Sequence, residues 1–571
     1  LVYDPDTDTV YAKPDAMFDQ HRRYALVVTD AVRDPAGNPV AADPAFSACL
    51  EPSGQTPYCA ALAAAVGQVA ERFAPAHIVG ASFFTTLSTT VWMEKARTLL
   101  DQVDPQVAPV GEPSVFAFSE IRGITLHEQT GAEPEAFSDF TLPVDNQLFQ
   151  GVGRVAFGSF VSPQFLNDQQ MIPPQPTGVD VPLPSTASTI PFVVWLPSQP
   201  APSGGYPVVI YGHGLGDNRF GGPTAVAPTL NRAGIAVIAI NAVGHGFGPK
   251  SNLTITTSTG SATIPAGGRS LDLNHDGAIE ATEGCLIFAP VPVALRDCLR
   301  QTAIDLMQLT RAISKGIDVD GDGTVDLDAG HIYYGGDSLG SLYGTIVSAV
   351  EPRIRASALT VGGGSVIDLT RWSPSYHSLA AGVLRSLRPT LLNQGDDFNE
   401  NYVLRYLPVK VNQVAGAIEI QNHFELLEWL QAVGDPIPYA PHLLSSTLPG
   451  VPIKPVLWQY ARGDRTVPNP ANTALVRAAN MRQTTWIYRH DLARQVLPTL
   501  PLNPHAFLLF FLSPDSGTVE LPDVGGLAVS IAAQQQIAGF FASDGAAIPN
   551  PNVIVQFILG QSLFEHPDFL P

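Results

Sequence analysis

Gly336-Asp337-Ser338-Leu339-Gly340 is the stretch of this 571-residue chain that decides the fold. It has the form G-x-S-x-G, in which small residues around a serine permit a sharp turn from a strand into a helix. The apolar residues 331–335 predict the strand before it, and residues 342–347 predict the helix after it. Such a turn holds the serine hydroxyl clear of the sheet, beside the amides of a helix N-terminus. The motif therefore predicts that Ser338 is a nucleophile.

Two later segments supply the acid and the base that such a serine needs. Residues 455–460 predict a buried strand, and Asp464 lies in the turn that follows it. A carboxylate at the C-terminal end of a parallel strand is well placed to orient an imidazole. His505 lies in a loop ahead of an apolar helix. Nucleophile, acid and base thus follow in the chain order of an α/β-hydrolase triad.

Other residues compete for these roles. Asp368 is expected at the end of the preceding strand, where some hydrolases carry their acid, but Asp464 has the more typical Gly-Asp turn followed by Thr-Val-Pro. His490 comes too soon after its strand and is interpreted as structural. His213 and His245 are most simply loop histidines that form hydrogen bonds. We therefore expect the triad to be Ser338, His505 and Asp464.

An oxyanion site is predicted from residues 208–216. Residues 208–211 predict a strand, and the Gly-His-Gly-Leu-Gly segment at 212–216 follows it directly. In α/β-hydrolases the loop after this strand folds back and offers an amide to the oxyanion. The amides of Leu215 and Leu339 are therefore the expected donors, and each such donor contributes about a hundredfold or more in rate.

Composition limits the class of partner. The chain is 45% hydrophobic and 15% charged, so it can build large cores, and its length predicts at least two domains. The formal net charge of −21 argues against nucleic acid and anionic membrane surfaces as partners. No apolar run is long enough to span a bilayer. The absence of a visible signal peptide, with a start at Leu1, favours a processed or truncated product.

The four cysteines fall into two close pairs, Cys49 with Cys59 and Cys285 with Cys298. Local pairing is the simplest of the three possible connectivities, and four buried free thiols are the alternative. A closed loop of about ten residues would contribute roughly 3 kcal/mol to stability. Paired cysteines predict an oxidising compartment, which means the periplasm, the cell surface or the medium.

The organisation of the chain predicts an accessory domain, a catalytic domain and a cap. Residues 1–145 carry no catalytic motif and predict a β-rich, immunoglobulin-like accessory domain with inserted helices. Residues 146–571 are expected to form the α/β-hydrolase domain, with a helical cap at 371–452. The cap aromatics either form the cap's own core or wall an acyl-binding pocket. They are Trp372, Tyr376, Phe398, Tyr402, Tyr406, Phe424 and Trp429.

Two acidic loops match calcium-binding patterns. Residues 272–283 fit the twelve-residue calcium loop at every ligand position, with a glycine at position 6 and a glutamate at position 12. Residues 318–329 repeat only the first half, so Asp326 or Asp328 would replace the closing glutamate. Solvated Asp/Gly turns are the alternative for both loops. The expected ligands of structural Ca²⁺ are Asp272, Asn274, Asp276, Ala278 and Glu283, then Asp318, Asp320, Asp322, Thr324 and Asp326.

The combination resembles bacterial secreted α/β-hydrolases of the virulence-factor lipase type. The resemblance is carried by residues 212–216, 336–340 and the Gly-Asp-Pro-Ile-Pro-Tyr-Ala segment at 434–440. It implies a serine carboxylesterase or lipase that acts on lipid, short-chain or polymeric esters, with association to lipid or polymer aggregates. A peptidase or acyltransferase of the same fold is one alternative. A surface adhesion or binding protein with a vestigial hydrolase domain is another.

Overall fold

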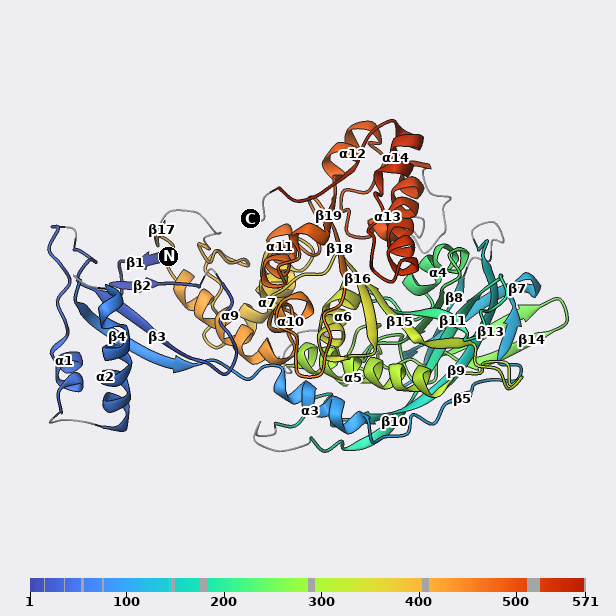
Figure 1. Cartoon of the computed structure of the whole chain (residues 1–571), viewed down its shortest axis with the longest axis horizontal. Coiled ribbons are helices and arrows are strands. Elements are labelled where there is room, and N and C mark those ends of the chain that lie inside the picture. Colours follow the sequence, from blue (N-terminus) through green and yellow to red (C-terminus); the bar gives the residue numbers. More distant parts are fainter. Residues whose placement is uncertain are drawn as a thin grey trace. The chain divides into compact units, whose positions relative to one another are not determined.

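The computed structural model describes all residues except 15, 35, 53–55, 74–75, 143, 145–148, 175–181, 286–292, 403–409, 511–523 and 569–571. The chain divides into two compact units (Figure 1). The smaller unit is Pro14–Thr89, and the larger unit comprises Leu1–Lys13 and Thr90–Pro571.

A central sheet of eleven strands organises the described residues of the larger unit (Figure 1). Its strand order is β20-β19-β18-β16-β15-β11-β12-β10-β9-β5, and β6 also pairs with β9. The strands that run parallel to their neighbours at its centre are β11 (Tyr206–Gly212), β12 (Ala236–Ile240), β15 (Leu327–Asp337), β16 (Ile354–Thr360), β18 (Val456–Ala461) and β19 (Thr485–Tyr488). The antiparallel strands are β5 (Ala108–Pro109), β6 (Val115–Ala117), β9 (Val152–Gln164), β10 (Thr186–Pro197) and β20 (Phe564–Glu565).

The topology of this sheet identifies the fold. Eight strands of this sheet can be numbered along the chain: β9, β10, β11, β12, β15, β16, β18 and β19. Their spatial order is then 1-2-4-3-5-6-7-8, and the second runs antiparallel to both neighbours. The strand that ends in the G-x-S-x-G motif lies at the centre of the parallel part. The larger unit therefore has the α/β-hydrolase fold, which confirms the fold class expected from the motif.

Helices cover both faces of the sheet, so its central strands are apolar on both sides. In β11, Val208 and Ile210 pack in one core with α5 and α6, whereas Val209 and Tyr211 pack in the other core with α4 and α13. Outside the insertion between β16 and β18, the described α-helices of this unit are α3 (Val91–Leu100), α4 (Gly222–Arg232), α5 (Ala294–Lys315), α6 (Leu339–Val350), α11 (Asn469–Ala478), α12 (His490–Val496), α13 (Val524–Ala542) and α14 (Asn552–Leu559). None of the described helices is both long and apolar enough to cross a membrane.

The smaller unit differs from the expected immunoglobulin-like domain. Its described residues form one two-stranded antiparallel sheet, β3 (Arg23–Thr29) with β4 (Ile78–Thr85), and two helices, α1 (Pro44–Leu50) and α2 (Pro57–Val69). An immunoglobulin-like domain needs two packed sheets. The immunoglobulin-like interpretation of this segment is therefore wrong for the residues that the structure describes.

The boundary between the units lies near residue 90 rather than near 145. β5 and β6 pair with β9 of the central sheet, and β7 (Ile121–Gly131) pairs with β13 (Asn252–Thr257). β8 (Ala136–Leu142) and β14 (Ser261–Pro265) complete that second sheet, in the order β14-β13-β7-β8. Residues 90–142 thus belong to the larger unit because their hydrogen-bond partners lie far along the chain.

Helices occupy the insertion between β16 and β18. They are α7 (Val366–Trp372), α8 (His377–Ser386), α9 (Ala417–Gln431) and α10 (Pro441–Leu444). The first residues of the chain join this region, because β1 (Val2–Asp4) pairs with both β2 (Thr9–Tyr11) and β17 (Lys410–Val411). The expected cap aromatic Tyr406 lies outside the described residues.

Candidate active site

Ser338 lies at a strained turn between β15 and α6. Its backbone has φ 53° and ψ −119°, a conformation that non-glycine residues rarely adopt. The neighbouring glycines have to be small: a Cβ at Gly336 would lie 2.7 Å from the carbonyl oxygen of Gly340. A Cβ at Gly340 would overlap the carbonyl of Gly212 at the end of β11. The motif is thus explained by close backbone packing around the serine.

Ser338, His505 and Asp464 form one hydrogen-bonded series. The Ser338 hydroxyl donates to Nε2 of His505 at 2.8 Å, and Nδ1–H of His505 donates to Oδ2 of Asp464 at 2.8 Å. Oδ1 of Asp464 accepts the amides of Thr466 and Val467 at 2.8 and 2.9 Å. The carboxylate is therefore held by its own turn, and its free oxygen is directed at the imidazole.

Asn503 ties the histidine loop to the acid turn. Its Oδ1 accepts the amides of His505 at 3.3 Å and Arg465 at 3.0 Å, and its Nδ2 donates to Thr466 Oγ1 at 2.9 Å. No sequence motif pointed to a role for Asn503. Its place two residues before the histidine, with a side chain suited to bonding turn amides, is the signal that could have found it.

Opposing effects set the protonation of His505. Burial lowers the pKa of His505, but the charge and hydrogen bond of Asp464 outweigh burial, so the pKa is raised above its ordinary value. The imidazolium formed after proton transfer is stabilised in the same way. His505 is therefore suited to accept the proton of Ser338.

Two carboxyl groups lie beside the nucleophile, those of the buried Asp337 and the partly buried Asp217. Burial, with a smaller contribution from the nearby Asp217 carboxylate, raises the pKa of Asp337 to about 7. Burial raises the pKa of Asp217 to about 6. Tyr211 donates its hydroxyl to Asp337 at 2.9 Å, and the Gly222 amide donates to Asp217 at 2.7 Å. Neither carboxyl group was predicted from the sequence. The raised pKa values of Asp337 and Asp217 limit the negative charge next to Ser338.

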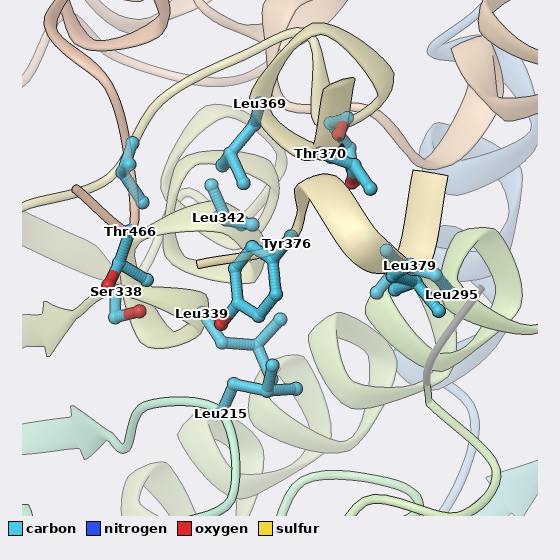
Figure 2. Close-up of a pocket in the computed structure, with 12 residues that line it drawn as sticks. Leu215, Leu295, Ser338, Leu339, Leu342, Leu369, Thr370, Tyr376, Leu379 and Thr466 are labelled. Atoms are coloured by element: carbon cyan, nitrogen blue, oxygen red, sulfur yellow. Dashed lines mark hydrogen bonds between the residues drawn. The ribbon is translucent and has the colours of Figure 1, made fainter. Parts of the chain in front are cut away.

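An apolar pocket opens beside Ser338 (Figure 2). It contains about 520 Å³ of empty space including its mouth. Leu215 and Leu339, which carry the two amides expected to bind an oxyanion, both line it. The full lining is Leu215, Leu295, Ser338, Leu339, Leu342, Val366, Leu369, Thr370, Tyr376, Leu379, Thr466 and Val467. An uncharged and mostly aliphatic wall suits the apolar part of a substrate.

The competing acid and histidines have other partners. Asp368 lies 3.3 Å from Arg371 and 3.6 Å from Lys13, in a cluster of charged groups in the cap. His490 is hydrogen-bonded through Nε2 to the carbonyl of Pro501 at 2.8 Å. Nε2 of His213 accepts the amide of Ala242 at 3.0 Å, and burial lowers the His213 pKa to about 4. His245 is likewise buried, with Nδ1 2.9 Å from the carbonyl of Val243. These contacts account for all four residues without a role in the series.

Most of the described cap aromatics belong to the cap itself. Phe398 and Phe424 are buried with ring centroids 5.7 Å apart, and Trp372 packs on Tyr402 at 4.8 Å. Trp429 is 59% exposed. Among the described cap aromatics, Tyr376 alone lines the pocket.

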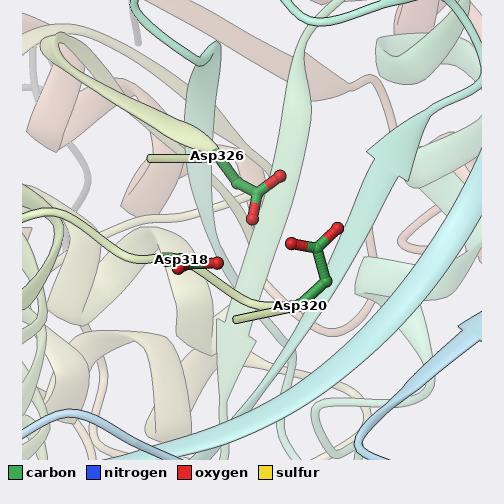
Figure 3. Close-up of side chains that lie close together, drawn as sticks. All are labelled: Asp318, Asp320 and Asp326. Atoms are coloured by element: carbon green, nitrogen blue, oxygen red, sulfur yellow. The ribbon is translucent and has the colours of Figure 1, made fainter. Parts of the chain in front are cut away.

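The second acidic loop brings three carboxylates together. Oxygens of Asp318, Asp320 and Asp326 lie within 4.8 Å of one another (Figure 3). Oδ2 of Asp326 also accepts the amide of Val319 at 2.8 Å, and Arg154 contacts both Asp320 and Asp326. Three acidic oxygens around one point fit a hard cation such as Ca²⁺.

The first acidic loop is held by hydrogen bonds to its own amides. Asp272 accepts the amides of Asp276 and Gly277 at 3.1 and 3.0 Å. Oε1 of Glu283 accepts the amides of Leu273 and Asn274 at 2.6 and 3.0 Å. Oε2 of Glu283 is buried without a hydrogen-bond partner in the described chain. No three acids of this loop gather as Asp318, Asp320 and Asp326 do.

Both cysteine pairs form disulfides, as the spacing predicted. Cys49 is bonded to Cys59 with a Cα separation of 5.0 Å, and Cys285 to Cys298 with 5.2 Å. The first bridge joins α1 to α2 in the smaller unit. The second anchors the start of α5, and both of its cysteines are fully buried.

No protein-family model and no curated protein matches the chain. Solved structures that are similar include an acetyl xylan esterase from a Paenibacillus species, with 12% identity and a TM-score of 0.35 over 72% of this chain and 94% of that one. An acetyl xylan esterase from a Thermoanaerobacterium species has 14% identity and a TM-score of 0.34 over 71% and 90%. An esterase from Pyrobaculum calidifontis has 14% identity and a TM-score of 0.30 over 63% and 83%. Function therefore has to be inferred from the geometry of the site.

Proposed function

We propose that the protein is a serine hydrolase of carboxylic esters. The observation that carries this proposal is the unbroken series from Ser338 through His505 to Asp464, which opens onto an apolar pocket. Each member follows the C-terminal end of a strand in the part of the α/β-hydrolase fold where nucleophile, acid and base belong.

The proposed reaction is acyl transfer to water. Ser338 attacks the ester carbonyl while His505 takes the hydroxyl proton, and His505 then returns that proton to the departing alcohol. Asp464 keeps Nδ1–H of the imidazole directed at itself and stabilises the cationic ring. The amides of Leu215 and Leu339 bind the oxyanion of the tetrahedral intermediate. Water then attacks the acyl-enzyme by the reverse proton route, which releases the acid and restores Ser338.

The aliphatic lining of the pocket favours apolar acyl groups. No charged side chain lines it, and Leu295, Leu369 and Leu379 offer only methyl groups to a ligand. Short-chain esters, lipids and polyesters can all present an apolar acyl group to this lining. The resemblance to secreted lipases extends the proposed substrates to aggregates of lipid or polymer. The two disulfides support a secreted, cell-surface or periplasmic location. A peptidase would need hydrogen-bonding groups for a peptide backbone, which this lining offers sparingly.

We also propose that the acidic loops bind Ca²⁺ in a structural role. The support is the gathering of Asp318, Asp320 and Asp326 and the buried, unpartnered oxygen of Glu283. A buried carboxylate oxygen without a partner is costly, and coordination to a cation would offset that cost. Asp326 immediately precedes β15, so the cation would brace the strand that leads to Ser338.

Substitution of Ser338 tests the proposed reaction. Ser338→Ala should lower kcat for p-nitrophenyl esters by about a millionfold and abolish labelling by a fluorophosphonate probe. Ser386→Ala, in an exposed serine at the end of α8, is the matched control and should label normally. Activity of the Ser338 variant within tenfold of the parent would refute the proposal.

Substrate comparisons separate the remaining alternatives. Hydrolysis of p-nitrophenyl esters well above that of the matching anilides would favour an esterase over a peptidase. A series of acyl chain lengths would then define the preference of the pocket. A parent protein that the fluorophosphonate does not label would favour the binding-protein alternative.

A further inference from the structure

Four hydroxyl groups line the pocket beside the nucleophile. In a site that is otherwise aliphatic, a few polar groups fix the orientation of the ligand. A hydroxyl already bonded to protein is less available to a substrate than one without a partner. The four residues are Ser338, Thr370, Tyr376 and Thr466.

Only the Tyr376 hydroxyl has no protein partner among the described residues. Thr370 Oγ1 donates to the carbonyl of Val366 at 2.9 Å, and Thr466 Oγ1 accepts the side-chain amide of Asn503 at 2.9 Å. The nucleophile is bonded to its imidazole. For Tyr376, the contacts in the described chain are backbone hydrogen bonds and apolar packing. A polar group in an apolar pocket is costly unless a ligand or water satisfies it.

The hydroxyl of Tyr376 is directed at the reacting end of the pocket. Figure 2 shows it on the side of the ring that faces Ser338 and Leu339, away from Leu295 and Leu379 at the other end. Leu339 carries one of the two amides proposed to bind the oxyanion. A donor on this side can therefore reach the ester group rather than the acyl tail.

Hydrogen bonds and apolar packing hold the segment that carries Tyr376 against the turn that contains Asp464. Ser373 Oγ donates to the carbonyl of Arg465 at 2.9 Å, and the Ser375 amide donates to the same carbonyl at 3.2 Å. The Tyr376 ring packs against Leu369, Val467 and Ala471. These contacts fix the ring relative to Asp464, so the hydroxyl is positioned before a substrate arrives.

The hydroxyl keeps its proton over the working pH range. Burial, and to a smaller extent the charge of Asp464, raises the pKa of Tyr376 to about 12. The group is therefore a neutral hydrogen-bond donor at pH 7 and not a base. Its interaction with an oxygen grows as that oxygen gains negative charge.

We propose that Tyr376 donates a hydrogen bond to the carbonyl-derived oxygen of the ester, as a third donor beside the amides of Leu215 and Leu339. This inference rests on the proposed ester hydrolysis. No proton is transferred: Tyr376 O–H remains intact while the carbonyl oxygen becomes an oxyanion and returns to a carbonyl. Because the charge exists only at the tetrahedral stage, the hydrogen bond accelerates the reaction more than it tightens substrate binding.

Tyr376→Phe tests the proposal because it keeps the ring and removes the hydroxyl alone. We expect kcat for a p-nitrophenyl ester to fall by about a hundredfold, the size of one oxyanion donor, with KM changed less than threefold. Fluorophosphonate labelling should slow in parallel. The melting temperature should stay unchanged, because the hydroxyl has no partner in the described chain. Tyr402→Phe, in a cap tyrosine that packs on Trp372 outside the pocket, is the matched control and should retain full kcat.

The outcomes distinguish this inference from the proposed function. Unchanged kcat in Tyr376→Phe, or a raised KM with unchanged kcat, overturns the role of the hydroxyl while Ser338→Ala still abolishes activity. An active Ser338→Ala variant overturns the proposed hydrolysis itself, and the inference about Tyr376 with it. A loss of kcat that Tyr402→Phe shares equally would mark a general effect on the cap and would also overturn the specific role.

Discussion

At the scale of single residues, the reactivity of Ser338 depends on the protonation of His505. The imidazole has to be neutral to accept the serine proton, yet the Asp464 carboxylate favours its cationic form. Since the His505 pKa is raised, the active neutral form is reached only as the pH rises through that raised value. Activity should therefore increase with pH above the ordinary range of histidine titration.

Asp464→Asn should show this coupling directly. Removal of the charge lowers the His505 pKa, so the acidic limb of the kcat/KM profile should move to lower pH. The maximal rate should fall by about ten-thousandfold, because the amide favours the wrong tautomer. Profiles measured from pH 5 to 9 with a p-nitrophenyl ester check both effects. Asp368→Asn is the control, since that carboxylate pairs with Arg371 and Lys13, and a larger loss there would reverse the assignment of the acid.

At the scale of elements, the cap's contribution to the pocket comes from α7, α8 and the residues between them, and not from the rest of the cap. Leu369 and Thr370 come from α7, Leu379 comes from α8, and Tyr376 lies between the two helices. α9 contributes its buried face to the cap's own core and leaves Trp429 in solvent. Differences in substrate preference should therefore originate in the segment that spans α7 and α8.

The second acidic loop leads into β15, so its proposed cation should affect stability more than rate. Chelation with EGTA should lower the melting temperature, and Ca²⁺ should restore it better than Mg²⁺, which tolerates irregular oxygen sites poorly. A hundredfold excess of ligand over Kd stabilises the folded state by about 2.7 kcal/mol. Protein that stays folded without the cation should keep most of its esterase activity.

Substitutions locate the calcium effect. Asp320→Asn should reduce the rise in melting temperature on addition of Ca²⁺, because it removes one of the three gathered carboxylates. Asp396→Asn, in a fully exposed cap acid, should leave that rise unchanged. If exhaustive chelation shifts no transition and elemental analysis finds no calcium, both loops are solvated turns.

At the scale of the whole molecule, the two units differ in how much they bury. In the described part of Pro14–Thr89, Leu62 is the one buried apolar side chain, whereas Leu26 and Phe84 of its sheet are 61% and 42% exposed. A unit with so small a core relies on its cross-link. The Cys49–Cys59 bridge, with a sequence separation of 10, contributes roughly 3 kcal/mol in the chain-entropy model.

Removal of this bridge should unfold the smaller unit alone. A Cys49→Ala, Cys59→Ala double variant should lose the corresponding transition in differential scanning calorimetry, while kcat/KM for ester hydrolysis changes less than twofold. The active-site residues all belong to the larger unit, which is the reason to expect this independence. Loss of activity in the double variant, or an unaltered calorimetric trace, would contradict it.

Short-range features were predictable from the sequence. The turn at Ser338 requires particular small residues at fixed spacing, so residues 336–340 and their flanking elements are recognisable locally. The same holds for the two disulfides, whose partners are 10 and 13 residues apart. The chain order of Ser338, Asp464 and His505 then follows from the order of strands in the fold. These are properties of backbone conformation and local spacing, and a sequence records them directly.

Only the tertiary structure decided which distant segments meet. Because β7 pairs with β13, the domain boundary lies near residue 90 and not near 145. The packing of α7 and α8 places Tyr376 in the wall of the pocket that Ser338 also lines. Likewise, the raised pKa of Asp337 depends on packing and burial. Strand partners, burial and side-chain direction arise from contacts between residues far apart in the chain, and no local pattern encodes them.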